Sequence, residues 1–209
     1  MINNVRAIGR ALVLQANRAS TFLLPWAGLF ALLLFWGRPG LAVEQAFAQA
    51  NPRHVEAAFL RNFTRYVTWP EDVFADKFSP WRICILGGDP FGRTLEETFA
   101  GRMEQGRSFE IFRADSTAEL PPCQIVFIAY KSRANRRAAL ASLRHQPVLT
   151  VGDASDFLQE GGIIRFDISD YVNFSVNLDQ AGSASLTIQT QMLEVSHEVV
   201  KNGFVRRRR

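Results

Sequence analysis

Apolar residues recur every three or four positions over Val55–Thr68 (VEAAFLRNFTRYVT), and this spacing predicts an amphipathic helix. Asn51-Pro52 suits the beginning of the helix and Trp69-Pro70 suits its end. The apolar side of this helix is expected to consist of Val55, Phe59, Phe63, Tyr66 and Val67. The folded part of the chain is therefore expected to begin with a helix that buries one side.

Short continuous apolar runs alternate with helical patterns through the middle of the chain. Runs such as ICIL and CQIVFIAY are typical of strands that are buried on both faces. The expected strands are Arg82–Leu86, Ser108–Arg113, Cys123–Tyr130 and Val148–Val151, and the expected helices between them are Pro90–Phe99 and Arg133–Arg144. The second of these helices is expected to carry a cationic face formed by Arg133, Arg136, Arg137 and Arg144.

The last third of the chain begins with a short helix or turn at Ala154–Glu160. Ile163–Ile168 and Tyr171–Leu178 are expected to pair as a hairpin, and a final helix is expected from about Ala184 to Val200. This order of elements favours an α/β layered fold, with a sheet of about six strands flanked by helices and an antiparallel hairpin at one edge.

The first 48 residues have the pattern of a secretory signal peptide. Arginines at positions 6, 10 and 18 precede an uncharged run of 15 residues, Phe22–Trp36, and A-x-A sites follow at 46–48 and 48–50. The run is short for a spanning helix, which needs about 20 apolar residues, but an uncleaved membrane anchor is the alternative. We therefore expect a signal peptide at 1–48, an α/β domain at 49–203 and a basic tail at 204–209, with the mature protein in the periplasm.

The net charge of +4 does not indicate a nucleic-acid-binding protein. Four arginines and one glutamate lie in residues 1–48, and four more arginines form the segment 206–209. The rest of the chain has 16 basic and 19 acidic residues, which is a slightly acidic body without an electrostatic footprint for nucleic acid.

The stretch ICILGGDPFGRT comes close to a phosphate-binding loop, G-x-x-x-x-G-K-[ST]. Asp89 would repel phosphate, Pro90 donates no N–H, and Arg93 replaces the lysine, so nucleotide hydrolysis is not expected. A strand-to-helix turn, with Asp89 as N-cap and Pro90 at the first helical position, explains the residues better. A small-ligand crevice at the carboxyl ends of the strands remains as a second interpretation, with Gly87, Gly88, Asp89, Gly92 and Asp153 as its candidate residues.

No spacing of residues singles out a catalytic or metal site. The sequence has no G-x-S-x-G, H-E-x-x-H or C-x-x-C motif, so we expect no catalytic residue, no metal and no cofactor. The two cysteines, Cys84 and Cys123, lie in or beside predicted buried strands. In an exported protein an even count favours a disulfide, and two buried free thiols are the alternative.

Five stretches in order resemble the YfiR-like family of periplasmic repressors, and they extend from residue 55 to about 200. They are VEAAFLRNFTRYVTWP, ICILGGDPFG, CQIVFIAY, PVLTVGDASDFLQEGGIIRF and VNFSVNLDQA. The resemblance implies an exported α/β domain, often a homodimer, without catalysis. It also implies that Cys84 and Cys123 form a strand-linking disulfide.

The resemblance further implies a function. The family's best-studied role is to hold an inner-membrane diguanylate cyclase inactive by binding its periplasmic sensor region, which lowers cyclic di-GMP and affects biofilm formation. An outer-membrane lipoprotein can sequester such a repressor. Two alternatives are a periplasmic small-molecule-binding protein and an accessory module of a sensor kinase or transport system.

Overall fold

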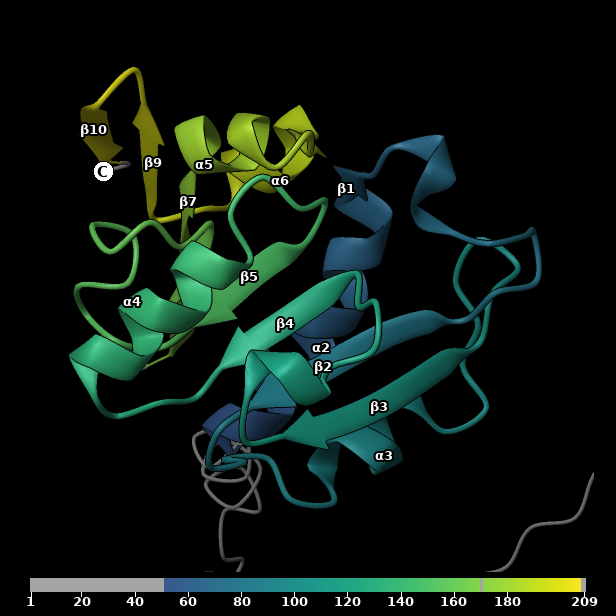
Figure 1. The fold of residues 1–209 in the computed structure, drawn as a ribbon. Coiled ribbons are helices and arrows are strands. Elements are labelled where there is room, and N and C mark those ends of the chain that lie inside the picture. Colours follow the sequence, from purple (N-terminus) through teal and green to yellow (C-terminus); the bar gives the residue numbers. More distant parts are fainter. Residues whose placement is uncertain (1–50, 170, 208–209) are drawn as a thin grey trace, which may run out of the picture. The chain divides into compact units, whose positions relative to one another are not determined.

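The computed structural model describes residues 51–169 and 171–207 of the chain. Its central feature is one sheet of eight strands, with helices on both faces (Figure 1). In spatial order the strands are β10 (Phe204–Arg207), β9 (Glu198–Lys201), β7 (Val172–Asn177), β6 (Ile164–Ile168), β5 (Leu149–Gly152), β4 (Ile125–Ile128), β2 (Trp81–Leu86) and β3 (Phe109–Ala114). The helices are α2 (Pro52–Tyr66), α3 (Thr94–Phe99), α4 (Arg133–Ser142), α5 (Leu178–Ser183) and α6 (Thr190–Glu194), with 3₁₀ turns at Glu71–Val73 and Thr117–Glu119.

The five strands from β3 to β6 run parallel, and β7 pairs antiparallel with β6. Beyond β7, strand β9 is parallel to it and β10 returns antiparallel to β9. The α/β fold and the hairpin are therefore confirmed, and the sheet has two strands more than expected because β9 and β10 extend it.

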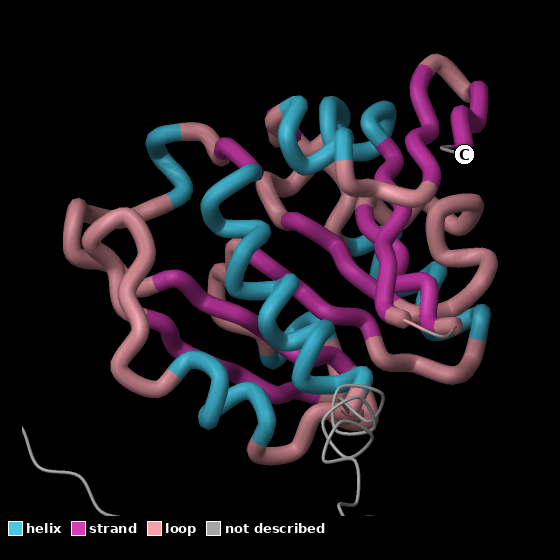
Figure 2. The backbone as a smooth tube through the Cα atoms, turned by 180° about the vertical axis from the view of Figure 1, so that it is seen from behind, coloured by secondary structure: helices cyan, strands magenta, loops and turns pink. Residues whose placement is uncertain are grey.

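The two faces of the sheet carry separate hydrophobic clusters because neighbouring residues of a strand point to opposite sides. Ile83 and Ile85 pack with Leu60 and Phe63 of α2 and with the residues of α3. Cys84 and Leu86 pack on the other face with Ala139 and Leu140 of α4. Figure 2 shows α2 and α3 across the face that lies behind the sheet in Figure 1. The runs of buried residues in β2, β4 and β5 follow from this double cover.

Helix α2 begins as predicted, and the predicted apolar side is confirmed at Phe63 and Val67 but not at Tyr66. The Asn51 side chain accepts a hydrogen bond from the N–H of Arg53, and Pro52 occupies the first turn. Its buried residues are Glu56, Ala57, Leu60, Phe63 and Thr64, whereas Val55 and Phe59 are half-buried and Tyr66 is exposed. The helix ends at Tyr66 because the next two residues form β1 (Val67–Thr68) and pair with β8 (Thr187–Ile188).

The expected final helix at about Ala184–Val200 is wrong. Helix α5 ends at Ser183, and Ser185 has a φ of 58° in the left-handed region, which interrupts helical backbone. Two short strands and the helix α6 follow, because Thr187–Ile188 pairs with β1 and Val199–Val200 pairs with β7. Tertiary strand pairing overrides the helical spacing of the apolar residues here.

Two local predictions are also corrected. Helix α3 begins at Thr94 and not at Pro90, so Asp89 caps a turn instead of a helix. The predicted cationic face of α4 is incomplete because Arg136 is buried. Its guanidinium bonds the carboxylates of Asp156 and Glu160, at 2.8 Å each, and thereby fixes the turn at 154–160 against the helix.

Candidate functional site

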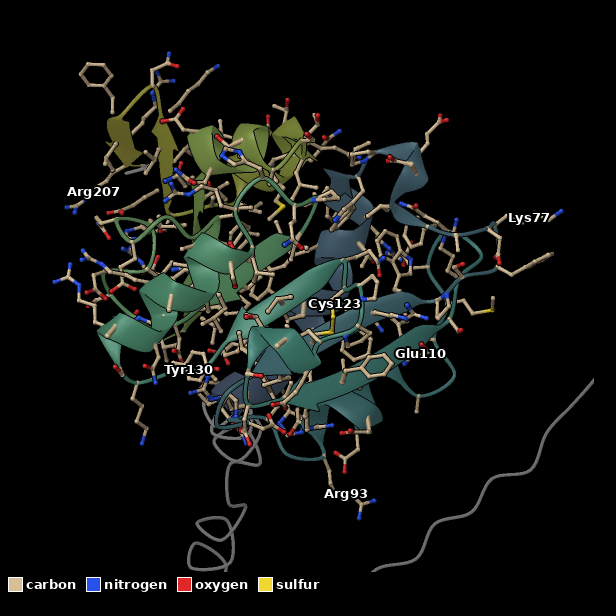
Figure 3. All side chains as sticks on the ribbon, viewed as in Figure 1. Lys77, Arg93, Glu110, Cys123, Tyr130 and Arg207 are labelled. Carbon is tan, nitrogen blue, oxygen red and sulfur yellow. A yellow bond between two sulfur atoms is a disulfide. The ribbon has the colours of Figure 1, made fainter. Side chains whose placement is uncertain are left out.

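The turn after β2 is held by contacts within the chain. Gly87 has a φ of 91°, and a Cβ at this residue would lie 2.7 Å from the ring of Tyr130. Only glycine satisfies both the left-handed backbone and the close approach of that ring. The Tyr130 hydroxyl donates to the carbonyl oxygen of Asp115 (Figure 3 labels Tyr130). The ring of Tyr130 therefore covers the strand end at which α/β sheets commonly bind ligands.

The acidic group of the turn is also fully engaged. Asp89 accepts a hydrogen bond from the N–H of Phe91 at 2.8 Å and from Arg113 at 2.7 Å. Arg113 also bonds Glu96, at 2.7 Å, and the carbonyl oxygen of Gly92, at 2.8 Å. The hydrogen bond from Arg113 holds the pKa of Glu96 below its usual value. This network leaves the predicted crevice residues Asp89 and Gly92 in structural roles, and Gly88 stands in open space without a close neighbour.

Asp153 lies at the carboxyl end of β5 and is connected to the same turn through a residue of α2. Arg53 bonds the Asp153 carboxylate at 3.1 Å, and its guanidinium lies 5.8 Å from the centre of the Phe91 ring. The structure thus links Asp153 to the Gly87–Gly92 turn through Arg53, which contacts Asp153 and the ring of Phe91. The sequence pattern did not indicate Arg53.

The same arginine pairs with Glu56, a carboxylate that is completely buried on α2. One oxygen of Glu56 lies 2.6 Å from Arg53, and the other, Oε1, has no hydrogen-bond partner. Burial raises the pKa of Glu56 to about 7, against the opposing effect of Arg53. A glutamate at a core-facing position four residues before Leu60 was the only sequence signal for this group.

A hollow of about 390 Å³ lies beside Asp153, at the turn end of the β6–β7 hairpin. Asp167 in its wall lies 3.7 Å from His197 and 2.7 Å from Arg165, and the Ser175 hydroxyl also bonds it. Ser175 contacts Asp167 and not His197. The histidine is therefore not placed as a base for the serine hydroxyl, as an activated nucleophile would require. The hollow offers a mixed polar surface with Tyr171 exposed at its edge.

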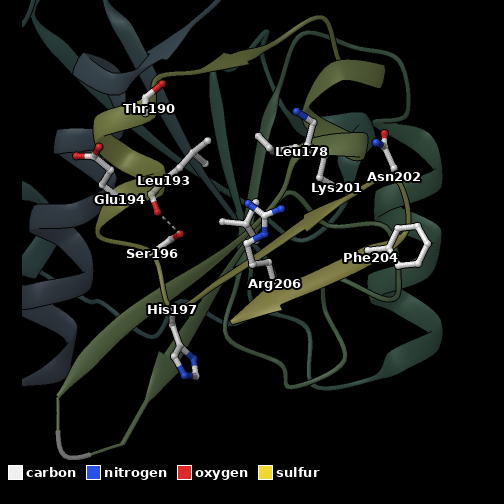
Figure 4. Close-up of a pocket in the computed structure, with 11 residues that line it drawn as sticks. Leu178, Thr190, Leu193, Glu194, Ser196, His197, Lys201, Asn202, Phe204 and Arg206 are labelled. Carbon is white, nitrogen blue, oxygen red and sulfur yellow. Dashed lines mark hydrogen bonds between the residues drawn. The ribbon is translucent and has the colours of Figure 1, made fainter. Parts of the chain in front are cut away.

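A larger groove, of about 570 Å³, lies between α5, α6 and the β9–β10 hairpin (Figure 4). Leu178, Leu193, Val199 and Phe204 supply its apolar surface. Its other lining residues are polar or charged, and they include Lys201 and Arg206. The sequence does not indicate this groove, because the groove depends on β9 and β10. Their residues were predicted as part of a helix and as a basic tail.

Cys84 and Cys123 form a disulfide with their Cα atoms 6.2 Å apart (Figure 3). Cys84 is in β2, and Cys123 lies close before the adjacent strand β4. The bond therefore links these two neighbouring strands on the α4 side of the sheet. Residues 51–169 and 171–207 contain no group of three or more His, Cys, Asp or Glu side chains that could hold a metal ion. Within the same ranges, every helix is too short or too polar to cross a membrane.

The profile of DUF4154, described as YfiR/HmsC-like, matches residues 53–197. The chain belongs to the YfiR/HmsC-like family. The match ends before β9, so the β9–β10 hairpin lies outside it. No curated protein matches the chain.

Two solved structures are similar to this YfiR/HmsC-like chain in part. One is the ABC domain in complex with L-Trp from Streptococcus pneumonia, with 14% identity, a TM-score of 0.47 and 71% of this chain covered. The other is a conserved domain protein from Vibrio cholerae, with 10% identity, a TM-score of 0.48 and 72% covered. The chain spans 60% of the length of each. No functional conclusion follows at this level of similarity.

Proposed function

We propose that this protein is a periplasmic regulator that represses an inner-membrane diguanylate cyclase by binding the periplasmic region of that enzyme, and so lowers cyclic di-GMP. The observation that carries the proposal is the match to the YfiR/HmsC-like family over residues 53–197. A stoichiometric repressor of this kind acts only through its preference for one conformation of the cyclase.

Other features support export and recognition. The first 48 residues have the order of a secretory signal peptide, and a disulfide such as Cys84–Cys123 persists in oxidising compartments. The polar groups of the glycine-rich turn are engaged by Arg113, and Tyr130 covers its first glycine. These contacts favour binding through the outer surface of the domain over chemistry at the strand ends.

Gene deletion tests the proposal. Loss of the protein should raise cellular cyclic di-GMP, and removal of the cognate membrane cyclase in the same strain should abolish that rise. A matched control strain expresses the protein without residues 1–48, which should keep it in the cytoplasm and leave cyclic di-GMP as high as in the deletion. An unchanged nucleotide level in the deletion strain would contradict repression.

A direct binding measurement separates this function from indirect effects. The purified protein should form a stoichiometric complex with the periplasmic region of the cyclase, whereas the cytoplasmic catalytic region should not bind.

The hollow of about 390 Å³ beside Asp153 favours one other candidate, a small-molecule-binding protein. That function predicts a ligand that co-purifies with the protein and that Asp167→Ala releases.

A further inference from the structure

The β9–β10 hairpin projects from the end of the sheet, and β10 is the outermost strand (Figures 1 and 2). All four residues of β10 are exposed, including Phe204 at 78% and Val205 at 56%. Large apolar side chains exposed together on an edge strand indicate an interaction surface. The hairpin also lies beyond residues 53–197, to which the family profile matches.

The C-terminal part of the sequence, which includes this hairpin, carries most of the excess positive charge of the chain. Lys201 and the four arginines from 206 to 209 are cationic, and Glu198 is the one acidic residue between 198 and 209. The Glu198 carboxylate is already bonded by Arg207, at 2.6 Å, and by Arg165, at 3.3 Å. The hairpin therefore presents a concentrated positive charge on a body that is slightly acidic.

Apolar and cationic side chains occur on both sides of β10. Strand alternation places Phe204 and Arg206 on the side of the groove, together with Lys201, which pairs with Phe204 across the hairpin (Figure 4). Val205 and Arg207 point to the opposite side. A groove on a protein would cover one of these sides, whereas the fluid headgroup layer of a bilayer can surround both.

The hairpin is fixed in place at its turn. Asn202 and Gly203 have positive φ angles of 54° and 74°, as a two-residue hairpin turn requires. Both backbone N–H groups donate to the carboxylate of Asp179 on α5, at 2.8 Å each. These bonds lower the pKa of Asp179, so its carboxylate stays ionised and the anchor persists at neutral pH. A hairpin held in this way needs little ordering when it binds.

We propose that the β9–β10 hairpin docks the protein on a membrane surface rich in anionic phospholipid. Phe204 and Val205 enter the boundary between headgroups and acyl chains, and Lys201 and Arg206 contact lipid phosphates. The further arginines of the sequence add to the electrostatic attraction. Docking of this kind confines an exported regulator to the surface in which its proposed partner is embedded. The inference does not depend on the identity of that partner.

Sedimentation with vesicles tests the proposal on the purified protein. It should bind vesicles of phosphatidylcholine mixed with phosphatidylglycerol, bind phosphatidylcholine alone weakly, and dissociate as salt is raised. Replacement of Arg206, Arg208 and Arg209 together by serine should lower the partition coefficient about a hundredfold, or about fivefold per arginine. Arg207 is retained because it bonds Glu198. Phe204→Ser should lower the partition coefficient about tenfold.

The chain offers a matched control for each variant. Phe78 is as exposed as Phe204, at 75%, and Phe78→Ser should leave vesicle binding unchanged. Replacement of Arg93, Arg102 and Arg137 by serine removes the same charge from exposed positions outside the hairpin and should also have little effect. Equal losses in the control and hairpin variants, or no binding to the anionic vesicles, would overturn the proposal. Binding of the hairpin only to an acidic protein fragment would also overturn it.

Discussion

Replacement of Glu56 by glutamine tests the electrostatics of the buried pair on α2. The Glu56 side chain is completely buried, and Arg53 contacts only one of its oxygens. Arg53 also forms an ion pair with Asp153, and the negative charge of Asp153 opposes ionisation of Glu56. Burial is the largest influence, and the pKa of Glu56 rises from 4.5 to about 7. Glutamine has the shape of the protonated acid but does not titrate.

The sign of the effect follows from proton binding. Between pH 4.5 and 7 the folded protein retains a proton on Glu56 that the unfolded chain has released. The stability contributed by this group is fully present below pH 4.5 and is lost as the pH rises through about 7. For these two pKa values, the loss between pH 5 and pH 8 is about 2–3 kcal/mol in the free energy of unfolding.

Urea-induced unfolding at pH 5 and pH 8, with the disulfide intact, measures this difference. The free energy of unfolding of Glu56→Gln, relative to the unsubstituted protein, should rise by about 2–3 kcal/mol from pH 5 to pH 8. Glu96→Gln is the matched control because the pKa of Glu96 is lowered, so its titration lies below this window. An equal difference for Glu56→Gln at both pH values would show that the folded protein holds Glu56 ionised and that Arg53 outweighs burial.

Two further predictions concern packing and the disulfide. Gly162→Ala should lower the free energy of unfolding by about 1–3 kcal/mol, because its Cβ would lie 2.2 Å from the buried ring of Phe157. Gly88→Ala, in open space, should stay within about 1 kcal/mol of the unsubstituted protein, and a similar loss in both variants would contradict the packing argument. Replacement of Cys84 and Cys123 by alanine should cost about 4 kcal/mol in chemical denaturation, since the disulfide closes a separation of 39 residues. An unchanged midpoint would show that the cross-link does not constrain the unfolded chain.

Three parallel strands of the sheet are predictable from the sequence because they are covered on both faces. Strands β2, β4 and β5 are apolar at most of their successive positions, and they appear in the sequence as short, mainly apolar runs. The Asn51-Pro52 start of α2 is also predictable, since the cap is a local interaction between neighbouring residues. Features that depend on one face or on nearby residues are thus available to sequence analysis.

The chemistry around the strand ends is less predictable because it depends on contacts between distant segments. The glycines at 87 and 92 indicate a turn, but nothing near them indicates that Tyr130 lies across it or that Arg113 bonds Asp89. Asp153 was a candidate because it follows a buried strand, yet its partner Arg53 comes from the start of α2. Such pairings are decided by the order of strands in the sheet, which the sequence does not state.

The error at the C-terminal segment has a different physical origin. The stretch EVVKNGFVRR contains Asn-Gly between two apolar pairs, which is a strong local signal for a hairpin. A helical spacing of Met192, Val195 and Val199 competes with that signal over the preceding residues. The competition is resolved by long-range contacts, namely the pairing of β9 with β7 and the Asp179 carboxylate beneath the turn. Because these contacts fix the hairpin, Phe204 and Arg206 lie on one defined surface, whereas a free basic tail would hold its charges without a defined apolar neighbour.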